Sequence, residues 1–224
     1  MIIYCMSDIH GFIDEFKENL SIIADNLKCE DSKLILLGDY IHGGNGGYEV
    51  CNAIIRLQEK YGTDKVIALL GNHERWCLEG RMPVDESSSF NEKFESVLLD
   101  WFSELPLYHV IENNIFVHAG IDEEAGDLWE LGTNDYYFTD KYPADIGRVE
   151  GLDKNIIAGH IGTWDIAKND TFHDIYYDGY CHYYIDGTTY VSSIIPMLKI
   201  DTTKGTYKEF IRSHWNDVLP YNKL

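Results

Sequence analysis

Short apolar runs recur along the chain, and several of them end abruptly in glycine and polar residues. In residues 34–40 (LILLGDY), four apolar residues and a glycine lead directly into Asp39. This is the pattern of a buried strand that delivers one carboxylate to the loop at its carboxyl end. The same pattern recurs at residues 2–7, 66–70, 115–117 and 156–158. Because α/β proteins bind ligands at the carboxyl ends of their strands, we expect the chemistry of the chain there.

Between the first three runs, apolar residues recur at helical spacing. They are Phe12, Phe16, Leu20, Ile23 and Leu27 after the first run, and Val50, Ile54, Leu57 and Tyr61 after the second. Each set marks one face of a helix that returns the chain across the sheet. Strand, helix, strand, helix, strand is typical of a parallel sheet with right-handed crossovers. The strand that ends in Asp39 would then lie between the other two.

The rest of the chain is less regular. We predict a helix over residues 87–103 with N-caps among Ser87 to Ser89, and an acidic loop over residues 121–135 with a helical turn near Trp129. β-branched and aromatic residues between turn signals predict strands at 175–177, 183–185, 192–200 and 206–211. No linker or internal repeat divides the sequence, so we expect one domain over residues 1–224.

Composition restricts where the protein works and what it binds. The formal net charge of -20, from 38 acidic and 18 basic residues, argues against a dedicated nucleic-acid binder. No apolar run approaches the roughly 20 residues of a membrane span, and the amino terminus lacks signal-peptide features. The five cysteines are widely spaced and odd in number, which is typical of reduced core thiols. We expect a cytoplasmic protein that does not contact membranes.

The polar residues at the strand ends are of the types that bind metals. The candidates are Asp8, His10, Asp39, Asn72, His118 and His160. Aspartate and histidine suit manganese, iron or zinc, while asparagine binds through its amide oxygen. On the middle strand, Asp39 could bridge two ions, and such a pair binds opposite oxygens of a phosphate and converts a water into a hydroxide nucleophile. His73 could then protonate the leaving oxygen, although a histidine there could also merely pack at a helix start.

In their order, these segments resemble the calcineurin-like metallophosphoesterases. The motifs are DIHG (8–11), GDYIHGG (38–44), GNHE (71–74), HAG (118–120) and GH (159–160). The likeness is strongest to the serine/threonine phosphoprotein phosphatases, including bacterial and phage members, and to the diadenosine tetraphosphatases. It implies a central β-sandwich of mixed sheets flanked by helices, not a simple doubly wound sheet. It also implies one ion at Asp8, His10 and Asp39, and a second at Asp39, Asn72, His118 and His160.

Two departures from the family pattern bear on function. The family has Asp-Arg after the bridging aspartate, where this chain has His42-Gly43, and a further arginine after a tryptophan, where this chain has LWELG (128–132). By the resemblance, that aspartate orients the catalytic histidine and the arginines bind phosphate. His42 could orient His73, contact phosphate itself, or be a solvated loop residue. Arg75, Arg81 or Arg148 could reach the site from elsewhere.

The favoured hypothesis is a two-metal phosphoesterase that hydrolyses a phosphate ester by attack of a metal-bound hydroxide, with manganese the first choice of ion and iron or zinc the alternatives. A phosphomonoester on a protein or small molecule is placed slightly ahead of a nucleotide such as a dinucleoside polyphosphate. The missing arginines keep two alternatives open, a pseudo-phosphatase that only binds a phosphorylated partner and a phosphodiesterase. We expect His173 and His182 in turns or cross-strand pairs, and Asp186 in a supporting hydrogen bond.

Overall fold

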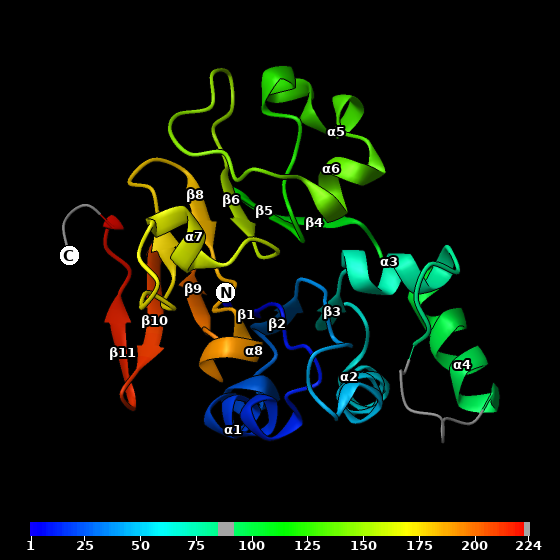
Figure 1. Ribbon diagram of the computed structural model, residues 1–224. Coiled ribbons are helices and arrows are strands. Elements are labelled where there is room, and N and C mark those ends of the chain that lie inside the picture. Colours follow the sequence, from blue (N-terminus) through cyan, green and yellow to red (C-terminus); the bar gives the residue numbers. More distant parts are fainter. Residues whose placement is uncertain (85–91, 222–224) are drawn as a thin grey trace.

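The computed structural model describes residues 1–84 and 92–221, which form two packed β-sheets with helices on their outer faces (Figure 1). The first sheet has the order β11-β10-β9-β1-β2-β3, and the second has the order β4-β5-β6-β8-β7. The first comprises β1 (Ile2–Met6), β2 (Ser32–Leu36), β3 (Val66–Ala68), β9 (Leu198–Asp201), β10 (Thr206–Ile211) and β11 (His214–Asp217). The second comprises β4 (Tyr108–Ile111), β5 (Asn114–Val117), β6 (Asn155–Ala158), β7 (Tyr176–Tyr177) and β8 (His182–Tyr184).

Each sheet has a parallel centre and antiparallel edges. In the first sheet β1, β2 and β3 are parallel, and in the second β5, β6 and β8 are parallel. The remaining pairs, which involve β4, β7, β9, β10 and β11, are antiparallel. The β-sandwich of mixed sheets expected from the resemblance is therefore confirmed.

Helices cover both outer faces of the sandwich. On the first sheet lie α1 (Ile13–Ile23), α2 (Gly47–Tyr61), α3 (Asn72–Leu78), α4 (Glu92–Ser103) and α8 (Thr189–Ser192). On the second lie α5 (Trp129–Gly132), α6 (Asp135–Asp140) and α7 (Thr163–Ala167), with η2 (Glu123–Leu128) leading into α5. A short turn, η1 (Asn26–Lys28), follows α1.

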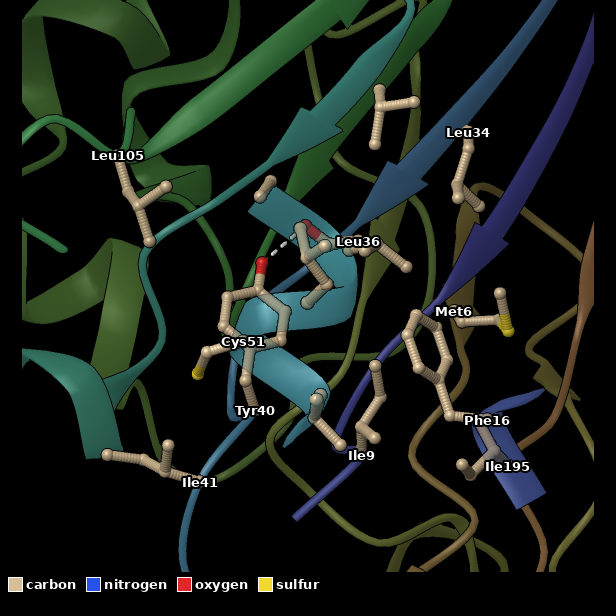
Figure 2. Close-up of a cluster of buried hydrophobic side chains, with 14 of the residues drawn as sticks. Met6, Ile9, Phe16, Leu34, Leu36, Tyr40, Ile41, Cys51, Leu105 and Ile195 are labelled. Carbon is tan, nitrogen blue, oxygen red and sulfur yellow. Dashed lines mark hydrogen bonds between the residues drawn. The ribbon is translucent and has the colours of Figure 1, made fainter. Parts of the chain in front are cut away.

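The apolar runs form three core layers because successive side chains of a strand point to opposite faces. On β1, Tyr4 and Met6 pack under α1 and α2, while Ile3 and Cys5 pack between the two sheets. Figure 2 shows the layer under the helices, where the hydroxyl of Tyr40 reaches the backbone carbonyl of Leu36. The carbonyl of Leu69 lies 2.8 Å from the same hydroxyl, so the two carbonyls share its one proton. Tyr40 is thereby anchored in the core, which fixes the backbone beside Asp39.

The structure agrees with most of the predicted elements and corrects some. Helices occur where the periodicity predicts them after the first two strands, and the described part of the third is α4, whereas the proposed caps at Ser87 to Ser89 lie outside the described residues. The strand predicted over 192–200 is wrong in its first half: Ser193 has a positive φ, Pro196 lacks an N–H, and only Leu198–Asp201 is paired. Strand β11 was not predicted.

A chain of buried charges ties the second sheet to its helices. The His182 ring lies 2.6 Å from an Asp178 oxygen through Nδ1 and 3.1 Å from a Glu123 oxygen through Nε2. Lys141 continues the chain, 3.3 Å from Glu123 and 2.5 Å from Asp145. Burial opposes the charged ring, but hydrogen bonds with Asp178, Cys181 and Glu123 outweigh it and raise the pKa of His182 to about 11. His182 is thus a charged structural residue.

This network predicts a pH-dependent stability. Because the pKa of folded His182 lies above its unfolded value, its contribution is complete below pH 6.5 and is lost as pH rises toward 11. The unfolding free energy should fall by up to about 1.4 kcal/mol per pH unit between pH 7 and 10. Urea denaturation should show this slope in the wild type and in the exposed control His214→Gln, but not in His182→Gln. Equal slopes in all three would contradict the assignment.

Candidate metal centre

The six candidate ligands converge where the parallel strands of both sheets end. Asp8 follows β1, Asp39 follows β2, and Asn72 begins α3 just after β3, while His118 and His160 follow β5 and β6. All except His118 line one cavity of about 520 Å³, together with His73. His118 is fully buried beneath it. The prediction that polar residues at the ends of the apolar runs lie close together is therefore confirmed for these six side chains.

The carboxylate of Asp39 lies between two groups of ligand atoms. Its Oδ2 is 3.7 Å from Nε2 of His10, which is itself 3.8 Å from an Asp8 oxygen. Its Oδ1 is 3.4 Å from Nε2 of His118. The amide oxygen of Asn72 lies 2.8 Å from His118 Nε2 and 3.0 Å from His160 Nδ1. Two sets of possible metal ligands, His10, Asp39 and His73 on one side and Asp39, His118 and His160 on the other, thus share Asp39.

The protonation of the histidines fits cations at these points. Nδ1 of His10 faces the carbonyl of Ile41 at 3.2 Å, and Nδ1 of His118 faces that of Leu37 at 3.0 Å. A carbonyl only accepts, so each Nδ1 carries the proton and each Nε2 turns a lone pair toward a carboxylate. If no ion is bound, swapping the oxygen and nitrogen of the Asn72 amide lets its NH₂ group donate to the lone pair of His118 Nε2. The lone pair of His10 Nε2 would still face a carboxylate oxygen of Asp39. A cation beside each ring would remove both conflicts.

The backbone at the centre adopts conformations that bring these side chains together. Asp8, His10, Asp39, His42 and His160 all have φ between 49° and 66°, the left-handed region that non-glycine residues seldom adopt. Each such residue costs about 1–3 kcal/mol, and such strain gathers at functional sites. Neighbouring glycines permit the close approach: a Cβ at position 71 would overlap the carboxylate of Asp39, and one at 159 that of Asp8.

Glu74 organises the loops of the centre, a role the sequence analysis missed. Its buried carboxylate accepts hydrogen bonds from the backbone N–H groups of Asp39 and Tyr40, both at 2.8 Å, and of Gly71 at 3.2 Å. The available signal was its position three residues after Gly71, where a glutamate of the first helical turn can accept from the N-cap backbone N–H. Glu74 thereby fastens the loop after β2 to the start of α3.

The protonation states of the buried candidate ligands depend on whether cations are bound among them. Burial raises the pKa of Asp8 to about 7, and burial with the nearby charges of Glu74 and Asp8 raises the pKa of Asp39 well above its ordinary value. Burial also lowers the pKa values of His10, His118 and His160. Divalent cations reverse these preferences for the carboxylates, so metal binding would release protons and weaken as the pH falls below about 7.

His73 and His42 form a pair beside Asp39. Nε2 of His42 faces the carbonyl of Pro83 at 2.8 Å, so it carries a proton, which leaves Nδ1 to accept from His73. Nδ1 of His73 lies 2.8 Å from it, and its Nε2 lies 3.7 Å from Asp39. Burial and the histidines His10, His42 and His160 lower the pKa of His73 to about 3. A docked phosphate anion would favour its protonated form.

None of the three arginines considered from the sequence lines this cavity. Arg75 pairs with Asp140 at 3.1 Å, the guanidinium of Arg81 lies over the ring of Trp76, and Arg148 lines other cavities. Among the described residues that line the cavity there is no arginine or lysine. Asp186 does line it and accepts from the backbone N–H of Thr188 at 2.6 Å, and its expected support of a metal ligand stays a prediction.

The two-sheet fold and the carboxylate shared by two sets of possible metal ligands are accompanied by a match to a known protein family. Residues 1–200 match the model of the calcineurin-like phosphoesterases, and the chain belongs to this family. It is similar to a symmetrical bis(5'-nucleosyl)-tetraphosphatase of Nitrosospira multiformis, with 32% identity over 129 residues, 54% of this chain and 44% of the relative. The chain spans less than half the length of the curated relatives that it matches.

Solved structures share the fold. A cold-active protein-tyrosine phosphatase of a Shewanella species superposes with a TM-score of 0.64 and 14% identity, over 97% of this chain and 80% of that one. A putative diadenosine tetraphosphatase superposes with a TM-score of 0.60 and 17% identity, over 93% and 92% of the two chains.

No helix among residues 1–84 and 92–221 is long and apolar enough to cross a membrane.

Proposed function

We propose that the protein is a dinuclear metal-dependent hydrolase of phosphate compounds. The observation that carries the proposal is the carboxylate of Asp39, which turns one oxygen toward His10 and the other toward His118. Asp8, His10 and Asp39 would hold one ion, and Asp39, Asn72, His118 and His160 the other. Manganese is the ion proposed, because mixed aspartate, histidine and amide ligands suit it. As substrate we favour a dinucleoside polyphosphate over a phosphomonoester, and the similarity to a symmetrical bis(5'-nucleosyl)-tetraphosphatase supports this choice.

The ions would polarise the phosphoryl group and supply a nucleophile from water. The residues of the chain do the rest. Asp39 belongs to both sets of ligands, and its Oδ1 accepts from the backbone N–H of His73 at 3.0 Å. The ring of His73 lines the cavity and donates through Nδ1 to His42. Once a docked phosphate anion has favoured the imidazolium form of this ring, its Nε2 would carry the proton that the leaving oxygen takes. His42 thereby takes the orienting place of the aspartate expected from the family pattern.

The test is hydrolysis by the manganese-reconstituted protein of diadenosine tetraphosphate, an aryl phosphate and the corresponding aryl diester. Turnover of the first two should fall roughly 10²–10⁴-fold in His73→Ala. In His42→Ala, kcat should fall about tenfold with little change in KM, because the acid is misdirected but still present. The control is His214→Gln, because His214 is an exposed histidine of β11 that does not line the cavity.

The possible outcomes separate the alternatives. Sustained turnover that depends on His73 removes a pseudo-phosphatase, the alternative suggested by the lack of arginines in the cavity. Turnover of the diester alone would assign a phosphodiesterase. A protein that binds manganese but turns over none of the substrates would refute the proposed hydrolase.

A further inference from the structure

The wall of the cavity above the metal ligands is aromatic. It includes Trp76 of α3, Tyr142 just after α6, Trp164 of α7 and Tyr190 of α8. The first is partly buried and held by its neighbours: its indole N–H donates to Asp140 and its ring centre lies 4.8 Å from that of His73. The other three come from separate short segments and stand around the mouth of one cavity.

Those three rings are unusually open to solvent. The exposed fractions are 67% for Tyr142, 37% for Trp164 and 61% for Tyr190. Single exposed aromatics are ordinary on protein surfaces, but several that border one cavity mark a surface that binds a ligand. Tyr190 is also set edge-on to the metal-ligand candidate His10, with 6.1 Å between the ring centres. The rings therefore reach to the ion site itself.

Trp164 is held in place although its ring is partly exposed. A Cβ at position 162 would overlap Nε1 of the indole and the hydroxyl of Thr188. Only glycine there lets the indole lie directly against the backbone. The ring is thus positioned before a ligand arrives, which lowers the entropy cost of binding to it.

The charges of the cavity give little further attraction for phosphate. Asp8, Asp39, Asp165 and Asp186 line it, and Asp165 is already paired with Lys168 at 2.9 Å. Two divalent ions would therefore leave only a small excess of positive charge over the other three carboxylates. Without an arginine among the described lining residues, affinity must come in part from uncharged contacts.

We propose that Trp164, flanked by Tyr142 and Tyr190, forms a stacking subsite for a nucleobase of the substrate, in place of an arginine clamp on its phosphates. This inference rests on the proposed function, because the phosphate chain of the same substrate reaches the ions at Asp39. A base offers a flat π-face whatever its identity, and stacking on one aromatic side chain typically changes affinity by about 5- to 150-fold. The subsite selects nucleotides over compounds without a base.

The experiment compares diadenosine tetraphosphate with inorganic tetraphosphate, which has the same number of phosphates but no base. The wild type should prefer the nucleotide in kcat/KM, and Trp164→Ala should lower this preference about tenfold or more, mainly through KM. Trp164→Phe keeps a stacking ring and should retain most of the preference. Tyr180→Ala removes a more exposed aromatic side chain that lines a different cavity, and it should leave the preference unchanged. A preference unaffected by Trp164→Ala would overturn the subsite while leaving the hydrolase intact.

A second measurement keeps the two proposals apart. Calorimetry with the manganese-loaded protein compares ADP with pyrophosphate, and no turnover is needed. ADP should bind more tightly, and Trp164→Ala should remove the difference. If no substrate is hydrolysed but this difference is found, the subsite stands and the hydrolase fails. If ADP and pyrophosphate bind equally, the subsite is refuted whatever the activity.

Discussion

Asp39→Asn should abolish turnover and remove at least one of the two ions. An amide has one oxygen to offer, whereas the carboxylate turns one oxygen toward His10 and the other toward His118. The activity lost should be roughly 10³-fold or more, since the ions together stabilise the transition state by several kcal/mol. Metal analysis after manganese reconstitution, with the hydrolysis assay alongside, measures both effects.

The matched control for this prediction is Asp165→Asn. Asp165 is the same residue type and lines the same cavity, but its carboxylate pairs with Lys168 at 2.9 Å and belongs to neither set of possible metal ligands. Its substitution should leave the metal content unchanged. Two ions per chain in Asp39→Asn would show that this carboxylate does not bridge, and the assignment of the centre would have to be revised.

The first half of the fold could be predicted from sequence because local periodicity and tertiary structure agree there. Each strand of the β1–β2–β3 unit is buried on both faces, so it appears as a continuous apolar run, and each crossover helix has one apolar face. Since the polar residues sit directly at the strand ends, their meeting point follows from the parallel order of the strands. The candidate ligands could therefore be chosen before any coordinates were known.

Other features depend on contacts distant in sequence. Trp164 and Tyr190 lie on short helices whose positions are set by tertiary packing. No local sequence pattern predicts that these two residues line the cavity. The strand predicted over 192–200 failed for a similar reason, because its β-branched residues are interrupted where the chain turns at Ser193. His182 does lie in a cross-strand pair, opposite Ile156, but its buried pairing with Glu123 could not be predicted because that partner is remote in sequence.

Glu74 also acts on residues distant in sequence, and we expect it to contribute more than any other side chain to the stability of the loops at the centre. Glu74→Ala would leave the buried N–H groups of Asp39, Tyr40 and Gly71 without an acceptor, at a cost of about 3–6 kcal/mol of unfolding free energy. Glu74→Gln should cost less, about 2 kcal/mol, since it keeps one acceptor oxygen and turns an NH₂ group against donors. Urea denaturation in the presence of a chelator isolates this contribution from metal binding.

Glu79→Ala, on the residue that follows α3, provides the comparison. Glu79 is 41% exposed and pairs with Arg75, so its loss should cost less than about 1 kcal/mol. A similar cost for both glutamates would mean that the loops hold their shape without Glu74. If Glu74 dominates as expected, its variants should also bind manganese more weakly, because Asp39 is held toward both sets of ligands only while the backbone behind it is fastened. The strained φ of Asp39 would then be maintained by a carboxylate 35 residues further along the chain.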